Sequence, residues 1–261
     1  MVTYNQNYTD NVRILPEEIM IIDRVKIKHN AQMIIRQSKP SLLTAGLIMT
    51  ALSALIGFLS LRLTGIDIKT ATDIMNASAE GRAELAASLM MRAMPSRGEI
   101  VMDLLLRLAL AIVGAGFSLF VMNSVRKTEP VLGNLLDGFS MMPRMLLLLL
   151  LESFFIAFWS MFFIIPGIVA AYRYRFAVYI MIDHPELGAM DCIRESKRLS
   201  YGYKGQLFVL DISFILWFFL CTLPVIGYAV QVYLKPYMET SRVLYYELIC
   251  RSAEYDEVTL Q

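Results

Sequence analysis

The chain has 261 residues, of which 57% are hydrophobic and 18% are charged, and its formal net charge is +1. Soluble domains average about 45–50% apolar and about 25% charged residues, so this composition favours a membrane protein. Because a near-neutral chain lacks the basic surface that releases counterions from nucleic acid, no nucleic-acid partner is expected.

Residues 1–40 are predicted to form a disordered polar tail followed by an amphipathic cytoplasmic helix. The first 15 residues are polar and show no periodic pattern, which is typical of disorder. From residue 17 to 38, four apolar residues recur at helical spacing and share one face. They are Ile27, Ala31, Ile34 and Ile35. This helix either lies on the membrane surface or packs on the protein's own cytoplasmic loops.

Six apolar stretches follow that could cross a bilayer as helices. About 20 apolar residues cover the hydrocarbon core, which is roughly 30 Å thick. The clearest example, SLLTAGLIMTALSALIGFLSL at 41–61, has no charged side chain. The expected spans are about 41–61, 101–124, 145–165, 168–182, 206–222 and 225–246. The fold class is therefore an all-α polytopic transmembrane bundle, with 41–250 as one transmembrane domain and 251–261 as a cytoplasmic tail.

Prolines should break the later spans and fold them into two tight hairpins. We expect Pro166 and Gly167 to separate the third span from the fourth, and Pro224 to turn the fifth into the sixth. Pro236 should kink the sixth span. A single kinked helix over 145–182 is the alternative, but it would be roughly 57 Å long and would overshoot the bilayer.

The basic residues predict that both termini are cytoplasmic. Six Lys or Arg residues precede the first span, others lie between spans two and three and between spans four and five, and the hairpin tips have none. The 62–100 segment would then lie outside, with a short helix at 83–93 that is stopped by Pro95 and Gly98.

The cytoplasmic segment after the fourth span is predicted to contain a capped surface helix over 185–199. Asp183 and Glu186 have the spacing of a capping box, and Pro185 would occupy the first turn. This helix either docks on lipid headgroups or is simply a stable connection.

Residues 164–248 also carry a recognisable set of motifs. They include IIPGIVAAYRYR, IDHPE, SKRLSYGYKG, LDISFILW and KPYMET. In this arrangement the sequence resembles the bacterial integral membrane family catalogued as domain of unknown function 975 (DUF975). The matching residues are Pro166, Gly167, Tyr172, Tyr174, Asp183, Pro185, Ser196, Lys197, Asp211, Ser213, Phe214, Trp217, Pro236, Tyr237, Glu239 and Thr240. The resemblance implies a multi-pass protein of the bacterial cytoplasmic (plasma) membrane and implies no activity.

Charged side chains within the spans are the main functional signal, because such residues are costly in lipid and are usually paired or functional. Counting from the inner ends of the spans places most of them at a similar depth. The expected polar network is Glu152, Arg173, Arg175, Asp211, Lys235 and Glu239. Glu152 and Asp211 should pair with Arg173 or Arg175, and Lys235 with Glu239. Hydroxyls could come from Tyr172, Tyr174, Tyr179, Tyr233 and Tyr237. The network either fixes helix packing or lines a site.

Catalytic signals are weak. The chain has two histidines, His29 and His184, both outside the spans, and it has no metal-ligand spacing, nucleophile motif or phosphate-binding glycine loop. No catalytic residue, metal or cofactor is therefore expected, and Cys192, Cys221 and Cys250 should remain free thiols.

The resulting functional hypothesis is a non-catalytic membrane protein that binds membrane lipids, or a protein partner or second copy, through this network. The alternatives are a small transporter of an anionic or lipid-like substrate and a lipid-modifying enzyme.

Overall fold

The computed structural model describes residues 22–63, 68–128, 130–140, 142–223 and 226–259, which form helices and no strand. The helices are α1 Arg24–Gln37, α2 Leu42–Leu63, α3 Ile68–Ala79, α4 Ala83–Ala93, α5 Arg97–Arg126, α6 Asn134–Asp137, α7 Met142–Phe162, α8 Ile164–Tyr174, α9 Ala177–Asp183, α10 Ala189–Leu199, α11 Lys204–Ile212, α12 Ile215–Cys221 and α13 Ile226–Thr259. The expected all-α class is confirmed. The predicted disordered tail lies outside the described residues.

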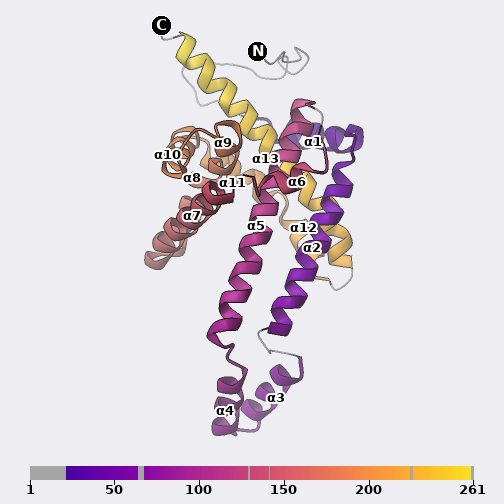
Figure 1. Ribbon diagram of the computed structural model, residues 1–261, viewed down its shortest axis with the longest axis vertical. Coiled ribbons are helices and arrows are strands. Elements are labelled where there is room, and N and C mark those ends of the chain that lie inside the picture. The colour runs from indigo at the N-terminus through magenta and orange to yellow at the C-terminus, as the bar shows by residue number, and fades with distance from the viewer. Residues whose placement is uncertain (1–21, 64–67, 129, 141, 224–225, 260–261) are drawn as a thin grey trace.

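Helix α13 organises the bundle, because α1, α2, α5 and α12 all pack against it. Figure 1 shows α2 and α5 running away from α13 toward the α3–α4 pair at the far end of the molecule. Helices α7 and α8 form a hairpin that diverges from α5. The C-terminal part of α13 and helix α1 lie at the end opposite α3 and α4 (Figure 1).

Four helical segments are long and apolar enough to cross a membrane. They are Leu42–Leu63, Arg97–Arg126, Met142–Phe162 and Ile164–Asp183. Helices α11 and α12 would add a fifth if they are taken as one span bent by 43°. The expected sixth span is helical within α13 but is not apolar enough to be among these segments. Lys235, Glu239 and Arg242 fall within eight residues of one another there. These helices are compatible with a membrane protein.

The α7–α8 hairpin exposes much of its apolar surface. Only 11% of the apolar window of α7 is buried inside the protein, and at the hairpin tip Met161 and Ile164 are 88% and 78% exposed. A contiguous apolar surface of this kind indicates contact with lipid or with another protein.

The hairpin turn lies at Phe163, three residues before the expected break at Pro166. Phe163 is extended, with φ −158° and ψ 153°, and α8 begins directly after it. Pro166 fits inside the first turn of α8 because an N–H there would have no helical partner. Gly167 allows close packing, since a Cβ there would lie 2.9 Å from the Cα of Ser160.

The other two prolines expected to interrupt helices are Pro224 and Pro236. Pro224 lies outside the described residues, although α12 and α13 do pack together as the expected hairpin. Helix α13 continues through Pro236, which packs against the position of Gly46 in α2.

The amphipathic helix α1 buries the apolar face that its sequence predicts. Ile27, Ala31, Ile34 and Ile35 are all buried, and the helix packs on α13. The side-chain amide of Gln32 on this helix donates a hydrogen bond to the Tyr237 hydroxyl at 3.3 Å. The structure thus agrees with packing on the protein itself.

The far end holds two helices where the sequence predicted one. Helix α4 has the predicted bounds, 83–93, and α3 was not anticipated. Gly98 does not stop a helix, because a capping box between Ser96 and Glu99 starts α5 at Arg97.

The expected capped helix at 185–199 begins later, at Ala189. Its N-cap is Gly188, which supplies no side-chain cap. Asp183 ends α9 instead of capping α10, because its carboxylate binds Arg126.

Gly46 on α2 and Gly116 on α5 allow close contact with neighbouring segments, whereas Gly57 and Gly114 on the same two helices do not. A Cβ on Gly46 would collide with the backbone carbonyl of Val232, and one on Gly116 with that of Leu135. A Cβ on Gly57 or Gly114 would meet nothing within 4 Å. The first pair sets the spacing of α2 with α13 and of α5 with the segment around α6.

Candidate functional site

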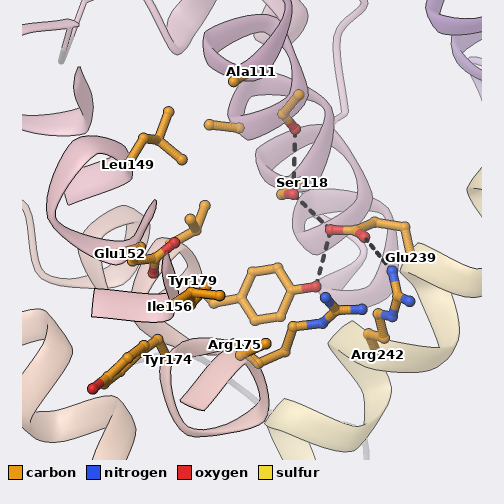
Figure 2. A pocket seen from close by; sticks show the side chains of 14 residues that line it. Ala111, Ser118, Leu149, Glu152, Ile156, Tyr174, Arg175, Tyr179, Glu239 and Arg242 are labelled. Carbon is orange, nitrogen blue, oxygen red and sulfur yellow. Dashed lines mark hydrogen bonds and ion pairs between the residues drawn. The ribbon is translucent and has the colours of Figure 1, made fainter. Parts of the chain in front are cut away.

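A cavity of about 280 Å³ lies between α5, α7, α8–α9 and α13. Apolar side chains form much of its wall, and charged and hydroxyl groups gather on the remainder (Figure 2). These polar residues are Ser118, Glu152, Tyr174, Arg175, Tyr179, Glu239 and Arg242. Four helical segments that are distant in sequence therefore supply one mixed polar and apolar pocket.

Asp211 on α11 holds two arginines behind this cavity. Its Oδ2 lies 3.2 Å from Nη2 of Arg175, and its Oδ1 accepts a hydrogen bond from Nε of Arg242 at 3.0 Å. The Tyr172 hydroxyl donates to Oδ2 at 3.1 Å. The expected Arg175–Asp211 pair is present, and Tyr172 contributes its hydroxyl as predicted. Arg242 was missed, although it lies within the last expected span, three residues after Glu239.

Glu239 on α13 is held from three directions. Its Oε1 accepts hydrogen bonds from the Ser118 hydroxyl at 2.6 Å and from the Tyr179 hydroxyl at 2.9 Å. Its Oε2 lies 4.0 Å from Nη1 of Arg242. The sequence identified Glu239 and Tyr179, but nothing in the spacing of Ser118 marked it as a partner.

Glu152 on α7 stands apart from the other acids. Its Oε1 is buried and has no hydrogen-bond partner among the described residues. Arg175 is near enough to interact with it electrostatically, but the two form no ion pair. In Figure 2, Glu152 lies across the ring of Tyr179 from Glu239 and Arg242. The expected direct pairing of Glu152 with an arginine is thus absent from the described part of the chain.

Two other expected members point elsewhere. The Nζ of Lys235 donates to the Ser53 hydroxyl at 2.8 Å and to the Met49 carbonyl at 3.3 Å, so it binds α2 instead of pairing with Glu239. The Nε of Arg173 is buried without a hydrogen-bond partner in the described structure. Asp211 and Glu239 contact Arg175 and Arg242 instead of Arg173.

A second charged cluster, not anticipated from the sequence, joins α5, α9 and α13. Arg126 donates from Nη1 and Nη2 to the two carboxylate oxygens of Asp183, at 2.6 and 2.8 Å. The same guanidinium contacts Oε1 of Glu247 at 2.6 Å. The Tyr246 hydroxyl adds a hydrogen bond to Asp183 at 3.0 Å. Every charge here has a partner, so this cluster is suited to holding helices together.

The three cysteines are free, as expected. Cys250 lies beyond the apolar helices, and burial raises the pKa of its thiol to about 12. Burial also raises the pKa of the Cys192 thiol. A raised pKa keeps a thiol protonated and unreactive, so neither has the properties of a nucleophile. Among the described residues, no group of His, Cys, Asp and Glu is arranged to hold a metal ion.

Residues 161–253 match the model of a family described as a protein of unknown function, DUF975. No curated protein and no solved structure matches the chain significantly. The match extends from the end of α7 through most of α13. It includes Arg175, Asp211, Glu239 and Arg242, whereas Ser118 and Glu152 precede it.

Proposed function

We propose that this chain is a multi-pass integral membrane protein of the bacterial cytoplasmic membrane that binds a membrane lipid without transforming it. The lipid headgroup would occupy the cavity beside Glu152, and its acyl chains would lie along the exposed apolar face of α7. The cavity is the observation that carries this proposal, because it combines charged groups with an apolar wall beside a lipid-compatible surface.

The size and chemistry of the cavity support a headgroup as the occupant. A volume of about 280 Å³ lies just below the range for small-molecule pockets, about 300–1,000 Å³, and is too small for a whole phospholipid. Charged residues within membrane helices commonly mark ligand sites when they face a cavity. The two cysteines with raised thiol pKa, Cys192 and Cys250, are poor nucleophiles, which favours binding over catalysis.

Gly114 offers a direct test, because it lines the cavity and a side chain there meets no neighbouring atom. We expect Gly114→Leu to fill the cavity and remove the tightly held lipid, with little effect on folding. Lipid retained by the purified protein would be counted by native mass spectrometry. Gly57→Leu is the matched control, since Gly57 has equal free space on the exposed surface of α2. Equal lipid retention by the two variants would contradict the proposal.

The membrane orientation is tested separately. Helix α1 and the end of α13 share one end of the molecule, and α3 and α4 occupy the other (Figure 1). With the basic residues placed inside, both termini should be cytoplasmic. A topology reporter at Gly81, between α3 and α4, should read outside, and one after Gln261 should read inside. A cytoplasmic reading at Gly81 would rule out this orientation.

A further inference from the structure

We infer that the occupant of this cavity carries a primary ammonium group, which pairs with Glu152, next to a phosphate, which binds Arg175. An aminophospholipid headgroup of the phosphoethanolamine type has this chemistry. The inference rests on the proposed lipid-binding function and specifies the class of lipid.

The first argument is the charge of the cavity and the cluster behind it. Three carboxylates, on Glu152, Asp211 and Glu239, face two guanidiniums, on Arg175 and Arg242. With all five ionised the group carries a net charge of −1. An uncompensated charge is costly in an apolar surrounding, and it is removed either when a carboxylate takes up a proton or when a ligand brings a positive charge.

The second argument identifies where that positive charge belongs. Asp211 contacts two arginines and a tyrosine, and Glu239 accepts two hydroxyl hydrogen bonds beside Arg242. Of the three, Glu152 alone has a buried carboxylate oxygen, Oε1, with no hydrogen-bond partner among the described residues. Glu152 is therefore the carboxylate that a cation would neutralise. The cation must also donate an N–H, which a primary ammonium does and a quaternary ammonium cannot.

The third argument concerns Arg175. Within the described part of the chain only its Nη2 is engaged, by one contact of 3.2 Å to Asp211, and 32% of its side chain is exposed. A guanidinium has five N–H donors in a planar fork, so several remain for an anion such as a phosphate. Arg175 lines the same cavity as Glu152. A ligand that carries an anion and a cation joined by a short linker would bind Arg175 and Glu152 at the same time.

The test uses the full-length protein in detergent, with thermal stabilisation by short-chain phosphatidylethanolamine, phosphatidylcholine and phosphatidylglycerol as the readout. We expect phosphatidylethanolamine to stabilise the protein at concentrations at least about tenfold lower than the other two, because a charge-assisted hydrogen bond contributes at least that factor. Equal potency of the three lipids would overturn the inference.

Two variants test whether Glu152 is responsible for the preference for phosphatidylethanolamine. Glu152→Gln keeps the shape of the side chain and removes its charge, so we expect it to fold normally and to lose the preference for phosphatidylethanolamine. Glu186→Gln is the matched control, because Glu186 is two-thirds exposed and does not line the cavity. An unchanged preference in Glu152→Gln would show that a proton, and not an ammonium, neutralises this carboxylate, and would overturn the inference.

Two further arms separate this inference from the proposed function. If Gly114→Leu removes the lipid but Glu152→Gln leaves the preference intact, lipid binding stands and the ammonium assignment fails. If free phosphoethanolamine stabilises the protein as well as the lipid does, the ammonium assignment stands and the ligand is a soluble solute.

Discussion

Arg126→Gln should lower the free energy of unfolding by about 3–5 kcal/mol, the typical cost of removing one partner from a buried ion pair. The Arg126 guanidinium is shared by Asp183 and Glu247, whose side chains are only 18% and 10% exposed. Without it, both carboxylates would remain inside the protein with no cation. Unfolding of the purified protein in mixed micelles, titrated with a denaturing detergent, would measure the loss.

Arg194→Gln provides the control for this prediction. Arg194 also pairs with an acid, Asp191, but its side chain is 77% exposed, and such pairs contribute only about 0.2–1 kcal/mol. In addition, Arg126→Gln combined with Asp183→Asn should cost less than the sum of the two single changes, because they remove one shared interaction. Equal losses at Arg126 and Arg194 would show that the cluster does not hold the helices together.

Asp211→Asn should be destabilising to a similar degree, about 3–5 kcal/mol, because it removes the charge of the carboxylate that two partly buried arginines share. Arg175 and Arg242 both contact Asp211, and the side chains of Arg242 and Asp211 are 18% and 13% exposed. The same unfolding titration would measure the loss. The exposed Asp191→Asn is the matched control, since its carboxylate is half exposed and binds a single arginine.

Comparison with Glu152→Gln makes this second prediction sharper. Glu152 has no hydrogen-bond donor at Oε1, so neutralising it removes a buried unpaired charge and should leave the stability of the lipid-free protein unchanged or slightly raised. A similar loss in Asp211→Asn and Glu152→Gln would mean that Glu152 belongs to the same network as Asp211, in conflict with the structure.

These contrasts divide the polar residues into two kinds. Arg126, Asp183 and Asp211 are surrounded by partners and hold helices in place. Glu152 and part of Arg175 face the cavity with unused hydrogen-bonding capacity. The sequence alone could not make this division, because a charged residue in an apolar stretch looks the same in either role.

The sequence by itself determined the helical class, the positions of the apolar segments and the buried face of α1. Each of these depends on local hydropathy and on the 3.6-residue repeat, which a window of neighbouring residues contains in full. The helix at 83–93 was also predicted within its bounds for this reason.

The tertiary structure decided which charges meet. Lys235 reaches Ser53 on α2 instead of its neighbour Glu239, and Arg126 binds Asp183 and Glu247 far along the chain. Such pairings depend on how each helix is rotated and how closely it approaches the next. Those two quantities are set by contacts between distant backbones, such as Gly46 against Val232, and no local pattern in the sequence contains them.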